Sequence, residues 1–338
     1  MSGRVLISGG TGYIAGYTIM QLLEAGYHVT ATVRDPQNTA ALKHLVELPD
    51  ASERLELVKA NLLGNDPFTE YAANADYVLH MASPYVITVK DPQRDLLEPA
   101  VRGTEAMLEA CAKSSSVKRV IVTSSMAAVT DEPDGSRTLT EDDWNERSSL
   151  TRNPYYFSKV RAEKAAWAFA EKHKPQWDLV TINPFMVLGP SLTSRVNESP
   201  GVLSDLMNGK YPAIFALALG IVDVRDVAAA HVRALTAERA NGRYICAAGV
   251  RSMRDIIGVL RDNGFGHTKL PSLSLESDFG VKLSRFAALF QPKGVRSYLQ
   301  THLGGTPSFD NSKIRADLEM CLQVAAHAFG LEQRGEAR

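Results

Sequence analysis

Short apolar runs alternate with amphipathic segments in the first part of the chain. Residues 4–8 form an apolar run that stops at a group of glycines, and residues 13–25 place apolar side chains at helical spacing. Residues 28–33, which read His-Val-Thr-Ala-Thr-Val, form a second segment typical of a strand. A short apolar run bounded by glycine is typical of a buried strand, and helical spacing is typical of an amphipathic helix. The pattern therefore predicts a strand, a helix and a second strand, with glycines at the first turn.

Five further apolar runs continue this alternation. They lie at residues 55–58, 75–80, 118–123, 177–182 and 242–246, and helices are expected over 98–113, from 154 onward, over 225–235 and over 252–263. Strands separated by helices predict an α/β protein with a doubly wound parallel sheet of the Rossmann type. Ligands of such sheets bind in the crevice outside the carboxyl ends of the strands.

The first predicted turn reads Gly9-Gly10-Thr11-Gly12 and opens the first helix. A glycine turn between a strand and a helix lets a pyrophosphate lie on the helix N-terminus. Gly12 permits close approach of the backbone, and Ala15 is the small residue where the helix meets the strand. We therefore expect this unit to bind a dinucleotide.

The second predicted strand ends in Val33-Arg34-Asp35. Chains that prefer NAD usually carry an acid at this strand end, for the ribose 2′-hydroxyl, whereas a guanidinium suits a 2′-phosphate. Asp35 begins a turn and could partly offset the charge of Arg34, and Arg34 could also be a plain surface charge. The sequence favours NADP (NADPH), with NAD possible.

Tyr155 and Lys159 lie four residues apart in Asn153-Pro-Tyr-Tyr-Phe-Ser-Lys159, so they share one face of the expected helix. An ammonium there stabilises a tyrosinate, and such a phenol can give a proton to a carbonyl oxygen or take one from an alcohol. The alternative is a solvated helix face. Tyr156, three residues from Lys159, is the rival phenol.

The composition of the chain argues against several classes of function. The chain has 338 residues and a net charge of −1, which gives no electrostatic reason to expect nucleic acid or an anionic membrane as a partner. Its three cysteines are scattered, so we expect buried free thiols and no metal site. The N-terminus runs directly into the first strand, and the apolar stretch 211–222 is too short to span a bilayer, so a cytoplasmic location is expected.

Several motifs together carry a family resemblance. They are Gly9-Gly-Thr-Gly-Tyr-Ile-Ala15, Ala31-Thr-Val-Arg-Asp-Pro36, His80-Met-Ala-Ser-Pro84, Thr123-Ser-Ser125, Tyr155-x-x-x-Lys159, Asn183-Pro184 and Asp223-Val-Arg-Asp-Val-Ala228. In this order they resemble an extended short-chain dehydrogenase/reductase. Within that superfamily they are similar to the branch of dihydroflavonol reductase, cinnamoyl-CoA reductase and ketoreductases.

The resemblance implies roles for individual residues. Ser125, Tyr155 and Lys159 would be catalytic. The cofactor contacts would be Gly9, Thr11, Gly12, Tyr13, Ile14, Ala15, Arg34, Asn61, Leu62, Ala82, Ser83, Thr123, Tyr155, Lys159, Pro184, Met186 and Val187. The substrate would contact Pro84, Tyr85, Ser125, Met126 and Phe185. That lining is mostly apolar, which favours an aromatic or alkyl ketone or aldehyde over a sugar nucleotide.

The resemblance also implies two lobes. Residues 1–185 would form the NAD(P)-binding Rossmann domain, to which 215–247 return, and residues 186–214 and 248–338 would form a smaller substrate-binding lobe. Oligomeric state stays open between a monomer and a homodimer.

The expected function is an NADPH-dependent carbonyl reductase, reversible as an alcohol dehydrogenase, with hydride transfer from nicotinamide C4 and Tyr155 as proton donor. The motif Asn153–Lys159 departs from that of cinnamoyl-CoA reductases, which weakens a thioester-reducing reading. Alternatives are a hydroxysteroid-type dehydrogenase, a nucleotide-sugar epimerase or dehydratase, and a non-catalytic dinucleotide sensor on the same fold.

Overall fold

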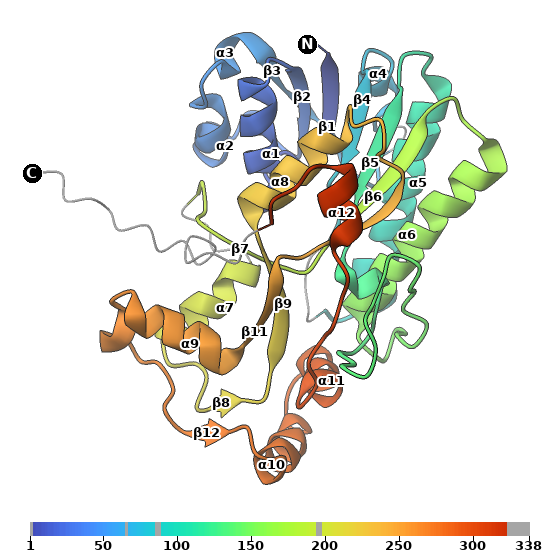
Figure 1. The fold of residues 1–338 in the computed structure, drawn as a ribbon. Coiled ribbons are helices and arrows are strands. Elements are labelled where there is room, and N and C mark those ends of the chain that lie inside the picture. Colours follow the sequence, from blue (N-terminus) through green and yellow to red (C-terminus); the bar gives the residue numbers. More distant parts are fainter. Residues whose placement is uncertain (1–2, 65–66, 85–88, 194–197, 323–338) are drawn as a thin grey trace, which may run out of the picture.

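Seven parallel strands form the central sheet of the protein, in a computed structural model that describes residues 3–64, 67–84, 89–193 and 198–322 (Figure 1). The strands are β1 (Arg4–Ser8), β2 (His28–Val33), β3 (Leu55–Lys59), β4 (Tyr77–His80), β5 (Arg119–Thr123), β6 (Asp178–Pro184) and β10 (Gly242–Cys246). Their order is β3-β2-β1-β4-β5-β6-β10, and every neighbouring pair is parallel. The seven predicted runs are confirmed as strands, and the fold is of the Rossmann type.

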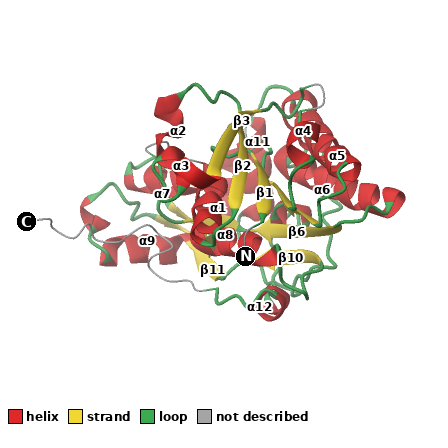
Figure 2. Ribbon diagram, turned by 90° about the horizontal axis from the view of Figure 1, so that it is seen from above, coloured by secondary structure: helices red, strands yellow, loops and turns green. Residues whose placement is uncertain are grey.

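Helices cover both faces of this sheet, as the view in Figure 2 shows. One face carries α1 (Tyr13–Glu24), α2 (Thr39–Val46) and α8 (Val224–Ala234), and the other carries α4 (Thr69–Ala72), α5 (Glu98–Lys113) and α6 (Pro154–His173). Along β1, Val5 and Ile7 belong to the first core and Leu6 to the second. Because both faces of the central strands are buried, β1 and β5 read as continuous apolar runs rather than as alternating ones.

A second, smaller group of elements lies below the main sheet in Figure 1. It contains a three-stranded sheet of β7 (Met186–Leu188), β9 (Ala218–Asp223) and β11 (Gly249–Ser252), and a two-stranded sheet of β8 (Ile214–Phe215) and β12 (Ser274–Leu275). Its helices are α7 (Glu198–Met207), α9 (Met253–Asp262), α10 (Asp278–Ala288) and α11 (Lys293–His302). Segment 215–247 divides between the two groups, since β9 pairs in the small sheet whereas β10 joins the large one.

Short elements complete the described chain. They are α3 (Ala51–Arg54), α12 (Ser312–Asp317) and three single turns, η1 (Gln93–Leu97), η2 (Met126–Ala128) and η3 (Phe265–His267). Turn η2 follows β5 and packs against α6, which places the segment after β5 beside the start of that helix.

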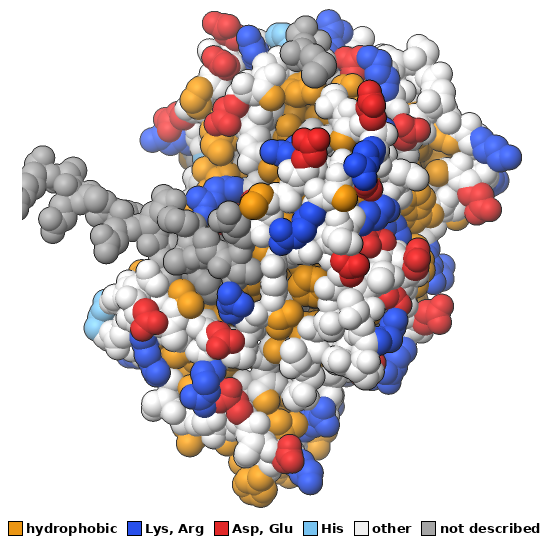
Figure 3. All heavy atoms as spheres, in the orientation of Figure 1, with side chains coloured by type: hydrophobic (Ala, Val, Ile, Leu, Met, Phe, Trp, Pro, Cys, Tyr) orange, Lys and Arg blue, Asp and Glu red, His pale blue; other side chains and the backbone are white. Residues whose placement is uncertain are grey.

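The surface carries charges of both signs side by side over the face seen in Figure 3. Apolar side chains gather at its lower end, where α10 exposes Phe279 and Phe286. Cys111 and Cys246 are buried as expected, but Cys321 is exposed, so the prediction of a buried thiol is wrong there. Among the described residues, no helix combines the length and apolar character needed to cross a bilayer.

Candidate active site

The carboxyl ends of four neighbouring strands collect the predicted site residues at one edge of the sheet. Gly9 follows β1, Ala82 lies two residues after β4, Ser125 lies two residues after β5, and Pro184 is the last residue of β6. The chain reverses its winding between β1 and β4, and a crevice opens at that point in sheets of this type.

The glycine turn after β1 has the close approaches that a dinucleotide requires. Gly9 has a positive φ of +73°, and a Cβ there would lie 3.0 Å from Ala82. A Cβ at Gly12 would lie 3.1 Å from the carbonyl oxygen of Gly9. Gly12 is also the N-cap of α1 without a side-chain cap, so amide groups of the first turn can bind an anion. These residues fit the pyrophosphate of a dinucleotide.

Residues after Gly12 tie α1 into the fold. Ala15 is buried against the core, and the Tyr13 hydroxyl donates to the carbonyl oxygen of Gly189 at 2.8 Å. Burial raises the pKa of Tyr13 far above its ordinary value. Thr11 is exposed at the turn and Ile14 is half-buried in the first turn of α1.

Ser8 and His80 support this turn, and no motif in the sequence points to the role of Ser8. Ser8 Oγ accepts the amide protons of Met81 and Ala82 at 3.1 and 3.0 Å, so its own proton goes to His80 Nδ1 at 2.9 Å. Burial lowers the pKa of His80 to about 3, so the imidazole is neutral near pH 7. His80 therefore holds two strand ends together. On the other side of the imidazole ring, Thr104 Oγ1 lies 3.4 Å from His80 Nε2.

Arg34 is exposed just beyond β2 and forms no ion pair with any described residue. Asp35 does not neutralise it, since Asp35 Oδ1 accepts the amide of Gln37 at 3.0 Å and closes the expected turn. The guanidinium is therefore available to a ligand phosphate.

Two further predicted cofactor residues follow β3. The side-chain oxygen of Asn61 accepts the amide of Leu63 at 3.2 Å, so it shapes the turn in addition to any contact with an adenine. Leu62 packs against Gly103 of α5, where a Cβ would lie only 2.7 Å from its Cδ2. The turn after β3 is thereby fixed against the helix that follows β4.

Tyr155 and Lys159 lie at the start of α6, as predicted. The Lys159 ammonium is 5.7 Å from the centroid of the Tyr155 ring. Lys159 is buried, and burial lowers its pKa to about 8, although the negative charge of Glu163 acts in the opposite direction. It donates no hydrogen bond to any described residue. A buried ammonium with free donors at this edge fits the ribose hydroxyls of a nicotinamide nucleotide.

Tyr156, the rival phenol, is engaged with the small lobe. Its hydroxyl lies 3.0 Å from His302 Nε2 on α11, and burial lowers the pKa of His302 to about 4. The Nδ1 proton of the neutral imidazole donates to the Tyr298 carbonyl oxygen at 3.1 Å, so Nε2 is left to accept the proton of the Tyr156 hydroxyl. The same helix fixes the residue before α6, since the Asn153 amide donates to Ser297 Oγ at 2.8 Å. The structure thus separates the two phenols that spacing alone left open.

Ser125 lies at the N-cap of η2, and its Oγ accepts the amide of Ala127 at 3.2 Å. Ser125 therefore caps the turn. An accepting oxygen keeps its own proton, so the cap leaves Ser125 able to donate to a substrate oxygen. Ser124 turns away, and its Oγ donates to Glu163.

Two of the expected substrate residues, Phe185 and Met126, belong to or pack against a small apolar cluster. Phe185 is buried there with its ring centroid 4.6 Å from that of Phe309, and Met126 packs against the same cluster. Pro84 is half-buried after β4. Tyr85 lies outside the described residues.

The remaining cofactor candidates lie at or next to strand ends. Ser83 is half-buried after β4, Pro184 ends β6, and Met186 and Val187 begin β7. Thr123 Oγ1 lies 2.8 Å from Nε2 of the buried His231, whose Nδ1 faces the Val227 carbonyl oxygen at 2.7 Å. Thr123 therefore has a protein partner already, and His231 joins α8 to the end of β5.

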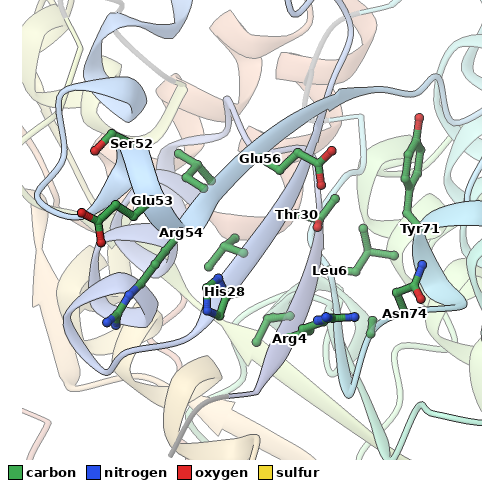
Figure 4. Close-up of a pocket in the computed structure, with 14 residues that line it drawn as sticks. Arg4, Leu6, His28, Thr30, Ser52, Glu53, Arg54, Glu56, Tyr71 and Asn74 are labelled. Carbon is green, nitrogen blue, oxygen red and sulfur yellow. The ribbon is translucent and has the colours of Figure 1, made fainter.

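A separate hollow lies at the opposite edge of the sheet (Figure 4). It is lined by Arg4, His28 and Leu55, which begin β1, β2 and β3, together with Glu56 and Tyr71 among others. Because the strands are parallel, these amino ends are far from the glycine turn, and the hollow is not the predicted crevice. The described part of the chain contains no group of three or more His, Cys, Asp or Glu residues that could hold a metal ion.

Fold and site together define a dinucleotide-dependent enzyme with a Tyr-Lys pair at the carboxyl edge of a Rossmann-type sheet. The model of the NAD dependent epimerase/dehydratase family matches residues 5–247. The chain belongs to this family, whose members are extended short-chain dehydrogenases/reductases. It is an NAD(P)-dependent oxidoreductase.

Named relatives give the same class. The chain is 40% identical to cinnamoyl-CoA reductase CAD2 of Medicago truncatula over 263 residues, which cover 76% of this chain and 80% of that protein. It is 36% identical to a (2S)-flavan-3-ol-forming anthocyanidin reductase of Vitis vinifera over 289 residues, which cover 81% and 83%. The structure is similar to that of Gre2 from Candida albicans in complex with NADPH, with a TM-score of 0.79, 29% identity and 96% of both chains covered.

Proposed function

We propose that the protein is an NADPH-dependent carbonyl reductase that also runs in reverse as an alcohol dehydrogenase. The observation that carries the proposal is the Lys159 ammonium, buried one turn after Tyr155 at the crevice edge. Bound NADPH would supply a hydride to the carbonyl carbon of the substrate.

The chain's own residues would act on the carbonyl oxygen. Negative charge grows on that oxygen as the hydride arrives, and donors aimed at the developing charge stabilise the transition state most. Ser125 Oγ and the Tyr155 hydroxyl are the two donors, and Tyr155 completes the proton transfer. Lys159 stabilises the tyrosinate that results and holds the ribose next to the phenol. In the reverse direction Tyr155 takes the proton from the alcohol.

Arg34 supports the choice of NADPH over NADH. Its guanidinium is exposed just beyond β2 and has no ion-pair partner among the described residues, so it can accept the 2′-phosphate of NADPH as a ligand. A planar guanidinium binds phosphate oxygens through two parallel hydrogen bonds. Gre2 of Candida albicans, similar in structure, was solved with NADPH.

An apolar wall of Met126, Phe185 and Phe309 supports an aromatic or other hydrophobic carbonyl substrate. Two relatives are named for cinnamoyl-CoA and anthocyanidin, both of which carry aromatic rings. A nucleotide sugar would need polar and basic partners for its diphosphate beyond those that the cofactor uses.

The test is the loss of nicotinamide absorbance with NADPH and NADH separately. The substrate panel contains aromatic aldehydes, α-ketoesters, diketones, dihydroflavonols, steroid ketones and a cinnamoyl thioester. Oxidation of NADPH that depends on one carbonyl class is the expected result. Tight cofactor binding without net oxidation by any substrate would refute the reductase and favour an epimerase, which the family description also covers, or a non-catalytic sensor.

A further inference from the structure

A buried carboxylate lies one helical turn beyond Lys159 on α6. The side chain of Glu163 has an exposed fraction of 0%, and it forms an ion pair with Arg243 of β10, at 2.6 Å between Arg243 Nε and Glu163 Oε1. A buried ion pair costs several kcal/mol of desolvation per ion, on the order of what its attraction returns, unless further hydrogen bonds complete it. A fold keeps such a pair at low cost only when both groups are fully bonded.

Glu163 is fully bonded. Its carboxylate accepts from four more side chains, which lie on α6, on β6 and just after β5: Ser124 Oγ, Thr181 Oγ1 at 3.1 Å, Asn183 Nδ2 at 2.7 Å and Trp167 Nε1 at 3.4 Å. The carboxylate therefore joins α6 to the end of β5, to β6 and to β10. No motif in the sequence points to this role of Glu163.

Two of these contacts lead directly to Ser125. Ser124 is its chain neighbour, and the Asn183 amide that donates to Glu163 also donates to the Ser125 carbonyl oxygen at 3.1 Å. One amide nitrogen has two protons, so Asn183 bridges the carboxylate and the backbone of Ser125. The orientation of Ser125 depends on where Glu163 holds these two partners.

Arg243 is itself fixed from its far side. Its Nη1 donates to the carbonyl oxygens of Glu141 and Asp143 at 2.6 and 2.5 Å, and its guanidinium lies 3.8 Å from the centroid of the Trp144 ring. The ion pair is therefore a rigid anchor rather than a mobile surface contact.

We propose that Glu163 is a positioning residue of the catalytic site, which sets the Ser124–Ser125 backbone through Asn183 and supplies the counter-charge of the Lys159 ammonium. The role of Ser125 and Lys159 rests on the proposed reductase function. Glu163 and Lys159 are four residues apart on one helix, so their side chains are neighbours.

Electrostatics around Lys159 agrees with this geometry. Burial lowers the pKa of Lys159 to about 8, and Glu163 opposes that shift. His80 of β4 and His231 of α8 carry pKa values lowered by burial to about 3 and 4, so both are neutral near pH 7. Arg243 is bound within its ion pair. The other ionisable groups of the neighbouring elements are exposed or half-buried. Glu141 lies on the far side of Arg243, and the rest lie on α5 and the turn before it: Arg94, Asp95, Glu98, Arg102, Glu105 and Glu109.

The test compares Glu163→Gln with Glu171→Gln. Gln keeps the size of the side chain and removes its charge, and Glu171 is an exposed residue of the same helix. In Glu163→Gln the alkaline limb of the kcat/KM profile should move to lower pH by on the order of one unit, because the ammonium loses its counter-charge. Glu171→Gln should leave the limb in place. A folded Glu163→Gln variant with an unmoved limb overturns the proposal, since a merely structural role lowers stability and kcat alone.

Glu163→Asp covers the case in which the Gln variant does not fold. It keeps the charge and shortens the reach to Ser124 and Asn183, so kcat should fall several-fold while the limb stays within a few tenths of a pH unit of the wild type. If the alkaline limb of Glu163→Asp moves to lower pH by about one unit, as expected for loss of the charge, the counter-charge role is overturned.

A readout without turnover separates this proposal from the reductase function. Ultraviolet difference absorbance of tyrosinate, referred in each background to Tyr155→Phe, reports the pH at which Tyr155 ionises. Glu163→Gln should raise that pH. Glu163 lies eight residues, or roughly 12 Å along the helix, from Tyr155, so its direct repulsion of the tyrosinate is the smaller effect. An unchanged pH would refute the role of Glu163 even if no carbonyl substrate is found, whereas failure of the substrate panel alone refutes only the reductase.

Discussion

The Lys159 ammonium lies 5.7 Å from the centroid of the Tyr155 ring, with the two residues one turn apart on α6. The pKa of Lys159 is lowered from its ordinary value to about 8 because the residue is buried. A lysine with a lowered pKa is charged below that pH and neutral above it. The stabilising charge beside Tyr155 is thus present up to mildly alkaline pH and lost beyond it.

Reductase activity should therefore fall as the pH rises through about 8. The profile of kcat/KM against pH reports the free enzyme and checks this expectation. Lys159→Arg keeps a positive charge throughout, so its alkaline limb should move to higher pH even though its rate is lower. A wild-type profile that stays flat through this range would contradict the role of the ammonium.

Tyr155→Phe should lower kcat by about 10²- to 10⁴-fold, which is the usual contribution of a positioned acid or base. Affinity for NADPH should change little, because the ring stays in place and only its hydroxyl is lost. Turnover and fluorescence titration of NADPH measure the two quantities. Tyr156→Phe is the matched control, since its hydroxyl faces His302, and it should retain most of the activity. Near-normal turnover in Tyr155→Phe would contradict the assignment.

Arg34→Ala should weaken NADPH roughly 10- to 100-fold, the loss expected for hydrogen bonds between charged groups. The affinity for NADH, which lacks the 2′-phosphate, should hardly change. Lys43→Ala on α2 is the control: that lysine is exposed and pairs with Glu47 at 3.6 Å, and its loss should affect both cofactors slightly. Equal losses for NADPH and NADH in Arg34→Ala would remove Arg34 from the phosphate site.

Acid should unfold the protein partly through its buried histidines. The pKa of His231 is lowered from 6.5 to about 4 by burial, so the unfolded chain takes up a proton first. Its contribution to stability is complete above pH 6.5 and is lost as the pH falls toward about 4. His231→Gln should reduce the slope of unfolding free energy against pH by about 1.4 kcal/mol per pH unit in this window. Urea unfolding across it measures the slope, and an unchanged slope would contradict the neutral imidazole.

Replacement by alanine should have opposite effects on stability at Gly220 and at Gly258. A Cβ at Gly220 would lie 2.0 Å from the ring of Phe185, so Gly220→Ala should cost about 1–3 kcal/mol of stability and displace the Phe185 ring, part of the proposed substrate site. A Cβ at Gly258 of α9 meets nothing within 4 Å, and Gly258→Ala should stabilise by about 0.5–1 kcal/mol. Chemical unfolding of the two variants checks both signs. A neutral Gly220→Ala would mean that Phe185 can move freely.

Local patterns were sufficient for most of the fold. The seven strands were predicted within two residues of their ends, because the central strands are buried on both faces and therefore read as apolar runs. The glycine turn, the position of Arg34 at a strand end and the Tyr155–Lys159 spacing were also readable, since each depends on residues close together in the chain. The sequence analysis assigned segment 215–247 as a whole to the Rossmann domain, whereas β9 pairs with β7 and β11 in the small sheet, because such pairing is decided by contacts between distant strands.

The sequence by itself determined the class of sheet, the edge at which a dinucleotide fits and the residues offered for chemistry. Only the tertiary structure decided which partner each of those residues has. Ser8 bonds to residues more than seventy positions away, Tyr156 is committed to His302, and Glu163 meets Arg243 eighty residues along the chain. A hydrogen bond across such separations is set by how helices and strands pack, and packing leaves no periodic signal in a single sequence.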